Sequence, residues 1–332
     1  MNRQGLLSII SPLPSSASGH ILLRADGETM TATATTETLS LSLSTPTDYA
    51  FSVAPKQDAL KTALTGLTGD DVKLTVADAL IVTAKGKRTI PCVEPDALPV
   101  VPLVDSEIIT TDGAALREAI AFTRGAAYQS IDKPMLCGVH LNGTDVVASN
   151  GSVMRCVRIA DDMPTLTIPS ATCALLSRVL PDESVTVQAN DKRLHIAWPR
   201  GSLTTGFAPT GFPPAYERWL SDWSGDSFTI RADEFAHAVN GVAAFTDGKT
   251  KPVYINCYEN VILSTHAAEE PLDMVFWAGD DRKILLNGGL LAELLSAFGK
   301  SEVTVTLKTG MTDPLMFKDA AGRMAILLPM RQ

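Results

Sequence analysis

The 332-residue chain contains no apolar run near the roughly 18 residues that a membrane span requires, so we expect no membrane-spanning helix. Its five cysteines are an odd number without any CxxC pair, which argues against both a disulfide framework and a zinc module. Basic residues are outnumbered by acidic ones, 28 to 37, and the net charge of −9 argues against a protein that coats nucleic acid with its whole surface. Near the N-terminus Arg3 precedes an apolar stretch, but Pro12 and Pro14 interrupt it, so we expect a cytoplasmic protein rather than an exported one.

The familiar catalytic motifs are also missing. The sequence has no GxSxG, HExxH, GxxxxGK[ST] or GxGxxG segment, and its five histidines are scattered without ligand-like spacing. Adjacent aspartates at 70–71, 161–162 and 280–281 are expected in turns, where neighbouring carboxylates diverge and do not converge on a metal. We therefore expect a non-catalytic protein without cofactor or metal, and an enzyme of unrecognised type is the alternative.

One phrase occurs three times along the chain. Each copy has a short strand-like run, a helix with paired apolar positions, a polar turn and then alternating Val, Thr and Leu. The strand anchors Val72, Val185 and Val303 are 113 and 118 residues apart, which is the length of a domain rather than of a solenoid repeat. The three copies begin at Phe51, Leu166 and Ile284.

A helix followed by several strands precedes each phrase, so each domain is predicted to be a doubled helix-plus-antiparallel-sheet unit of the α+β class. Boundaries near residues 100–105 and 221–227 divide the chain into domains at 1–104 (shortened), 105–225 and 226–332. Turns are expected at Asp26-Gly27, Asn142-Gly143 and Asn150-Gly151. The six predicted helix windows are 3–11, 56–66, 112–127, 169–180, 231–245 and 288–300.

Charge is distributed unevenly between these helices and the rest of the chain. The six windows carry a net charge of +2, which leaves −11 for the remainder. Basic helices in an acidic body suit a protein that touches phosphates with one face only, whereas the plainer alternative is that each helix exposes a solvated face of mixed charge. The basic residues of the windows are Arg3, Lys56, Lys61, Arg117, Arg124, Arg178, Arg231 and Lys300.

Several segments resemble the bacterial sliding clamp, the β subunit of DNA polymerase III. The closing DPLMFKDAAGRMAILLPMRQ resembles that family's C-terminus, where a final strand ends in a Met-Pro-Met-Arg-Leu type tail. Residues 148–154, Ala-Ser-Asn-Gly-Ser-Val-Met, resemble the family's Ala-Thr-Asp-Gly-His-Arg-Leu turn, and GFPPAYERWL at 211–220 is similar to its Phe-Pro-Asp-Tyr segment. The short first domain and the divergent sequence suggest a clamp encoded by a phage or mobile element.

The resemblance implies three tandem clamp domains per chain and a homodimeric ring with helices inside and sheets outside. Double-stranded DNA would pass through the ring without base contacts, and the eight basic helix residues would face it. The implied partners are a DNA polymerase and a clamp loader, and no cofactor is implied. A clamp-fold decoy that binds clamp-binding peptides without encircling DNA is the alternative.

In that family, partner proteins dock short peptides in an apolar pocket between the second and third domains. Two of the residues that correspond to this pocket, Ile326 and Leu328, are interpreted equally well as part of the hydrophobic core. The departures from the family pattern are Ser152-Val153 in place of His-Arg, Gln332 in place of the final Leu, the bulk of Trp219 and an extra residue within PPAY, and they predict a reshaped pocket. Carried over by position, the pocket residues are Leu136, Ser149, Gly151, Ser152, Val153, Met154, Pro213, Arg218, Trp219, Ile326, Leu328, Pro329, Met330 and Arg331.

Overall fold

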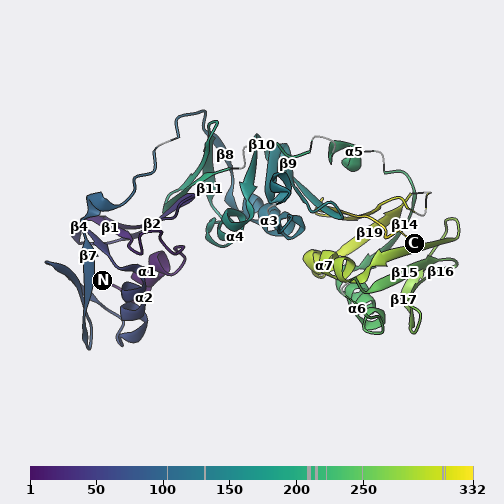
Figure 1. The fold of residues 1–332 in the computed structure, drawn as a ribbon, viewed down its shortest axis with the longest axis horizontal. Coiled ribbons are helices and arrows are strands. Elements are labelled where there is room, and N and C mark those ends of the chain that lie inside the picture. The colour runs from purple at the N-terminus through teal and green to yellow at the C-terminus, as the bar shows by residue number, and fades with distance from the viewer. Residues whose placement is uncertain are drawn as a thin grey trace. The chain divides into compact units, whose positions relative to one another are not determined.

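The computed structural model describes residues 1–102, 104–130, 132–207, 211–213, 216–221, 223–248, 250–308, 310 and 312–331. The chain forms two compact units (Figure 1). The first comprises Met1–Arg117 and Leu175–Pro209, and the second comprises Glu118–Ala174 and Thr210–Gln332. Gln332 itself lies outside the described residues, as do parts of the predicted boundary segments.

The first unit is built on one eleven-stranded sheet, with α1 (Arg3–Ile10) and α2 (Gln57–Gly66). Its strand order is β5-β6-β7-β4-β1-β2-β3-β13-β12-β11-β8. The pairing of β3 with β13, with Leu41 opposite Leu203, makes the sheet continuous between the predicted first and second domains. The strands are β1 (Leu22–Asp26), β2 (Thr29–Thr35), β3 (Leu39–Pro46), β4 (Ala50–Pro55), β5 (Lys73–Val76), β6 (Ala79–Thr83), β7 (Lys87–Val93), β8 (Ile109–Asp112), β11 (Ser184–Ala189), β12 (Arg193–Trp198) and β13 (Gly201–Gly206).

The two faces of β2 and β3 differ because side chains alternate along a strand. Met30, Ala32 and Ala34 of β2 are buried in the core. The intervening threonines lie on the other face, where their hydroxyl groups bond across to serines of β3, and such cross-strand pairs stabilise the sheet. These pairs are Thr31–Ser44 at 2.8 Å, Thr33–Ser42 at 2.8 Å and Thr35–Ser40 at 3.1 Å.

The second unit contains a six-stranded sheet, in the order β14-β19-β20-β21-β10-β9, and a four-stranded sheet, in the order β17-β16-β15-β18. Its helices α6 (Ala232–Ala243) and α7 (Gly288–Phe298) lie side by side (Figure 1). The short α5 (Tyr216–Leu220) also belongs to it, and the division between the units passes through α3 (Gly113–Thr123) and α4 (Ser170–Val179). The strands are β9 (Gly138–Ser149), β10 (Val153–Pro169), β14 (Asp226–Arg231), β15 (Pro252–Cys257), β16 (Asn260–Ser264), β17 (Glu269–Phe276), β18 (Arg282–Asn287), β19 (Glu302–Leu307), β20 (Leu315–Asp319) and β21 (Met324–Leu327).

The predicted α+β class and the repeated phrase are confirmed. Each of the six predicted windows contains a helix, and the order strand–helix–strand recurs as β4–α2–β5, β10–α4–β11 and β18–α7–β19. The helix α5 was not predicted, because five residues beside two prolines carry no helical periodicity. The division into three domains stays a prediction, since sheets run between neighbouring repeats through β3–β13 and β10–β21.

Two of the three predicted Asn-Gly or Asp-Gly turns are confirmed, and the third is wrong. Asp26-Gly27 joins β1 to β2, and Asn150-Gly151 joins β9 to β10. Asn142-Gly143 instead lies within β9, which continues through it and pairs Gly143 with Met163 of β10 at a bulge. Gly143 has a φ of +57°, so the glycine accommodates the irregularity while the strand continues on both sides. The 161–162 aspartate pair lies in the same bulged part of β10, so its predicted turn is also wrong.

A buried arginine ties the second unit's sheet to its helices. Arg155 on β10 is only 5% exposed, and it donates to the backbone oxygens of Phe122 at 3.2 Å and Glu293 at 3.1 Å. Burial lowers the pKa of Arg155, and the Glu293 carboxylate opposes that shift. The guanidinium groups of Arg155 and Arg323 both lie over the Phe122 ring, which makes an edge contact with Phe298 of α7.

We predict that Arg155→Ala lowers the free energy of unfolding by about 2–4 kcal/mol, because it leaves two inward-facing carbonyls without their donors. The matched control is Arg158→Ala on the same strand, where a 63% exposed side chain pairs with Asp145 and should contribute less than about 1 kcal/mol. Urea unfolding followed by tryptophan fluorescence measures both. Equal losses in the two variants would contradict the anchoring role of Arg155.

Candidate functional site

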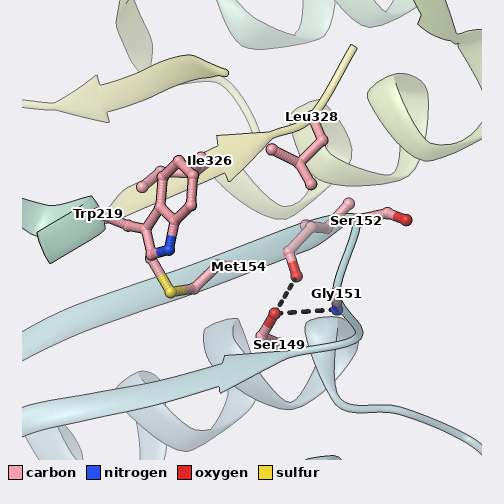
Figure 2. A pocket seen from close by; sticks show the side chains of 8 residues that line it. Ser149, Gly151, Ser152, Met154, Trp219, Ile326 and Leu328 are labelled. Carbon is pink, nitrogen blue, oxygen red and sulfur yellow. Dashed lines mark hydrogen bonds between the residues drawn. The ribbon is translucent and has the colours of Figure 1, made fainter. Parts of the chain in front are cut away.

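A small apolar cavity of about 150 Å³ lies where β10, β21 and α5 meet (Figure 2). Trp219 stands on one side of this cavity and Leu328 on the other in Figure 2. Its lining residues all belong to the second unit. They are Ser149, Gly151, Ser152, Val153, Met154, Trp219, Ile326 and Leu328, and all eight were predicted by position from the family resemblance.

The turn between β9 and β10 forms the polar rim of the cavity and is held by its own side chains. The Asn150 Oδ1 atom accepts hydrogen bonds from the backbone N–H groups of Ser152 and Val153. The Ser149 hydroxyl donates to the Val153 carbonyl oxygen at 3.0 Å and accepts from the Gly151 N–H at 3.1 Å. Gly151 has a φ of +88°, a conformation that favours glycine. The rim is therefore rigid before any ligand arrives.

The strand β21 supplies the opposite wall. It pairs with β10 so that Ile326 lies directly opposite Met154, and the ladder extends beyond the strand through the Leu328 N–H, which donates to the Ser152 oxygen at 2.9 Å. Ile326 is 4% exposed, whereas Leu328 is 38% exposed. Ile326 thus belongs both to the core and to the cavity, and Leu328 presents its side chain at the opening.

Aromatic contacts hold the segment that carries Trp219. Phe212 stacks on His140 with ring centroids 4.9 Å apart, and Tyr216 makes an edge contact with Phe212. The Tyr216 hydroxyl accepts from the Asn142 amide at 2.9 Å and donates to the Asp145 carboxylate at 3.3 Å. With these two residues fixed, α5 places Trp219 beside the cavity, where its indole is 45% exposed.

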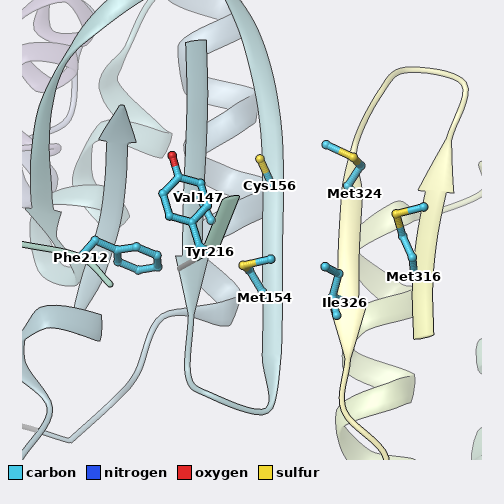
Figure 3. Packing of buried hydrophobic residues seen from close by; sticks show 8 residues of the cluster. All are labelled: Val147, Met154, Cys156, Phe212, Tyr216, Met316, Met324 and Ile326. Atoms are coloured by element: carbon cyan, nitrogen blue, oxygen red, sulfur yellow. The ribbon is translucent and has the colours of Figure 1, made fainter. Parts of the chain in front are cut away.

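Beneath the cavity lies a methionine-rich hydrophobic cluster (Figure 3). Alternation along β10 and β21 directs Met154, Cys156, Met324 and Ile326 to this cluster. Methionine side chains are flexible, so they adapt to neighbours of different shape. Leu136, Leu220 and Trp223 pack against the cluster, whose buried members are Val147, Met154, Cys156, Phe212, Tyr216, Met316, Met324 and Ile326.

A second, larger cavity of about 620 Å³ shares Leu328 with the first. The tail reaches it because the Met330 N–H donates to the Leu285 oxygen of β18 at 2.8 Å. Three of its residues, Lys283, Leu285 and Thr312, were not predicted, and the contact between tail and strand is what brings Lys283 and Leu285 to the site. The predicted Pro213 and Arg218 line neither cavity, and they lie beside and within α5. The second cavity is lined by Lys283, Leu285, Thr312, Leu328, Pro329, Met330 and Arg331.

The eight predicted DNA-facing residues differ in exposure and in the contacts that the structure shows for them. Lys56, Arg124, Arg178 and Lys300 are exposed. Contacts within the chain are seen for Arg3, Lys61, Arg117 and Arg231. Arg3 donates to the Leu67 oxygen at 2.7 Å, Lys61 donates to the Leu13 oxygen at 3.2 Å, Arg117 pairs with Asp182 at 2.6 Å, and Arg231 pairs with Asp233 at 2.6 Å and with Glu234 at 3.1 Å. Their contact with DNA stays a prediction.

The described residues contain neither a cluster of metal ligands nor a membrane-spanning helix. No group of three or more His, Cys, Asp or Glu side chains in that part of the chain is arranged to hold a metal ion. Across the same residues, no helix combines the length and the apolar character needed to cross a membrane. The chemistry visible at the site is therefore that of an apolar cavity with a rigid polar rim, next to a second cavity that carries two cations.

The architecture is that of the bacterial sliding clamps. The clamp from Caulobacter crescentus superposes with a TM-score of 0.88 at 20% identity, over 100% of this chain and 98% of its own. The DNA polymerase III β subunit from Bartonella birtlesii, bound to griselimycin, gives 0.90 at 15% identity over 100% and 99%, and that from Pseudomonas aeruginosa gives 0.87 at 18% over the same shares. No protein-family model and no curated protein sequence matches the chain. The low identities are those of a divergent clamp fold.

The site also predicts a dependence of stability on pH. Burial lowers the pKa of His140 from 6.5 to about 4, against opposing effects of the Leu166 backbone and the Asp145 charge. Between those values the unfolded chain binds a proton at His140 that the folded chain does not. The contribution of neutral His140 to the free energy of unfolding is therefore fully present above pH 6.5. It is lost as the pH drops toward 4, by on the order of 2–3 kcal/mol.

Urea unfolding at pH 7 and at pH 4.5 tests this, with His140→Gln as a variant that cannot titrate. The pH-dependent loss should be smaller in His140→Gln than in the native chain, whatever the variant's stability at pH 7. His237→Gln, at an exposed position on α6, is the control and should keep the native pH dependence. An unchanged loss in His140→Gln would contradict the assignment.

Proposed function

We propose that this chain is a DNA sliding clamp: a non-enzymatic, cytoplasmic replication factor whose homodimeric ring encircles duplex DNA and tethers a DNA polymerase. The observation that carries the proposal is the agreement of fold with sliding clamps over the entire chain, at TM-scores of 0.84–0.90. The surface chemistry supports it, because an acidic chain with a few exposed basic residues on or beside its helices can touch phosphates on one face and repel DNA elsewhere.

The first cavity would receive the partner proteins. It presents an exposed tryptophan and an exposed leucine, which leave apolar surface uncovered at a rigid rim. Exposed aromatic and aliphatic groups around a small pocket are typical of sites that take one or two apolar anchor residues of a peptide. A polymerase or clamp loader with a Leu or Phe anchor would bind here, held by burial of that side chain.

The sheet edges support a head-to-tail dimer. Among the described strands, β5 pairs only with β6 and β17 pairs only with β16, so each ends a sheet. The first edge carries exposed Lys73, and the second carries exposed Glu269 and Asp273. Each also exposes an apolar side chain, Val76 at 37% and Phe276 at 73%. An interface that joins two different edges is heterologous, and it forms a closed ring when the rotation between copies closes.

Charge reversal tests this dimer. In Lys73→Glu the β5 edge becomes acidic, and in Glu269→Lys/Asp273→Lys the β17 edge becomes basic, so like charges meet in either homodimer. We expect each variant alone to weaken dimerisation about tenfold or more. The mixture of the two should dimerise again, since both interfaces of the mixed ring then join opposite charges. Small-angle scattering measures the mass, which is 35.3 kDa per chain and twice that per ring.

The control for this experiment is Arg24→Glu/Lys318→Glu, two reversals at exposed positions on β1 and β20 that lie outside both edges. It should keep the native dimer mass. A native chain that stays at 35.3 kDa at high concentration would refute autonomous ring closure. Failure of the mixture to recover would place the dimer interface elsewhere.

Topology distinguishes a clamp from the decoy alternative. Protein diluted to dissociate the ring and then concentrated with a closed circular plasmid should elute with the plasmid during gel filtration. Cutting the plasmid once should release it, because a ring slides off free ends. A linear plasmid with streptavidin bound at both biotinylated ends should retain it.

Equal retention on free linear and circular DNA would mean ordinary surface binding, and no retention on either would favour the decoy. The same experiment tests whether the predicted DNA-facing residues contact the DNA. Reversing Lys56, Arg124 and Lys300, which lie next to the ends of α2, α3 and α7, should reduce loading, whereas reversing Arg24, Lys192 and Lys318, which are exposed on β1, between β11 and β12 and on β20, should not.

A further inference from the structure

The second cavity has a charge that the first lacks. Its only charged lining residues within the described chain are the cations Lys283 and Arg331, and the rest of its lining is apolar apart from Thr312. Both cations are exposed. In the part of the chain that the structure describes, neither forms an ion pair with a carboxylate. An isolated basic pair is notable in a chain with a net charge of −9.

The two cations are positioned by the fold. The Lys283 ammonium lies 4.4 Å from the centroid of the Tyr254 ring on the neighbouring strand β15. Lys283 and Leu285 are two residues apart on β18, so their side chains share one face of the strand. The backbone bond from Met330 to Leu285 holds the tail, and with it Arg331, beside that strand. Charged groups held in advance lose little freedom when they bind a ligand.

The shared residue Leu328 makes the two cavities neighbouring parts of one site. We propose that the second cavity binds an aspartate or glutamate side chain of the same partner peptide whose apolar anchor fills the first cavity. The inference rests on the proposed peptide-docking function and adds to it a rule of partner choice. The charge complementarity is specific, because an amide in place of the carboxylate loses the attraction to both cations.

Four peptides test the rule. Their N-termini are acetylated and their C-termini amidated, so that the only carboxylates are those of side chains. Two place Glu-Glu before or after a Ser-spaced anchor, as Gly-Glu-Glu-Ser-Leu-Phe-Gly and Gly-Leu-Phe-Ser-Glu-Glu-Gly, and two have Gln in place of Glu. Labelled peptides are titrated with the full chain by fluorescence anisotropy at 50 and 300 mM salt. With Glu-Glu either before or after the anchor, at least one Glu peptide should bind about fivefold to tenfold more tightly than the matching Gln peptide at 50 mM salt. The difference in affinity should be smaller at 300 mM salt.

The double variant Lys283→Gln/Arg331→Gln should abolish this preference, so that within this variant the Glu and Gln peptides bind with equal affinity. The matched control Lys192→Gln/Lys318→Gln removes the same charge at exposed positions outside both cavities and should keep the preference. If Glu and Gln peptides bind equally, or if both double variants behave alike, the rule is wrong while the docking function stands. If no Leu-Phe peptide binds the folded chain, both are wrong. If Lys283→Gln/Arg331→Gln weakens DNA binding but keeps the Glu preference, the two cations contact DNA phosphates and the proposal fails.

Discussion

The pairing of β10 with β21 is the interaction on which the second unit depends. It is antiparallel, with Met154 opposite Ile326 and Arg155 opposite Ala325. Because side chains alternate, this one ladder directs Met154 and Ile326 to the cavity and Arg155 to the helices. A shift of one residue would exchange the two faces and remove both the cavity and the arginine anchor.

The cavity leaves apolar side chains in contact with water, and the surrounding structure compensates for that cost. Trp219 and Leu328 are substantially exposed, whereas Phe212 and Tyr216, which come just before Trp219, are buried. The Phe212 ring stacks on His140, and the Tyr216 hydroxyl bonds to Asn142 and Asp145. Burial of these aromatic side chains stabilises the segment, so that the exposed residues need contribute nothing to folding. Such a division between buried support and exposed contact is typical of a binding surface.

The basic side chains of this protein have two roles, internal hydrogen bonding and exposure at the surface, and the composition alone does not distinguish them. Arg3, Arg117 and Arg155 donate to backbone oxygens and connect elements far apart in sequence. Lys56, Arg124 and Lys300 are exposed on or beside helices, and Lys283 is exposed beside the tail. A loose grip on duplex DNA needs only a modest number of exposed cations, since each additional phosphate contact strengthens binding and opposes sliding. Arg3, Lys61, Arg117 and Arg231, four of the predicted DNA-facing residues, make contacts within the chain, and the loose grip of the proposed clamp function is compatible with that.

The sequence by itself determined the α+β class, a helix in each of the six predicted windows and the recurring strand–helix–strand order, and its resemblance to the clamp family in the tail, the 148–154 turn and the 211–220 segment supplied the eight residues that line the first cavity. The class, the helices and their order depend on short-range patterns of apolar periodicity, whereas the cavity residues were available only through the family resemblance. Only the tertiary structure decided that β9 continues through Asn142-Gly143, that α5 forms, that Arg3 and Arg117 bond to backbone oxygens and that Lys283 lies at the site. Each of those outcomes follows from a contact with a segment distant in the chain or from a buried strand face that overrides a local turn signal, and local spacing carries no record of such contacts.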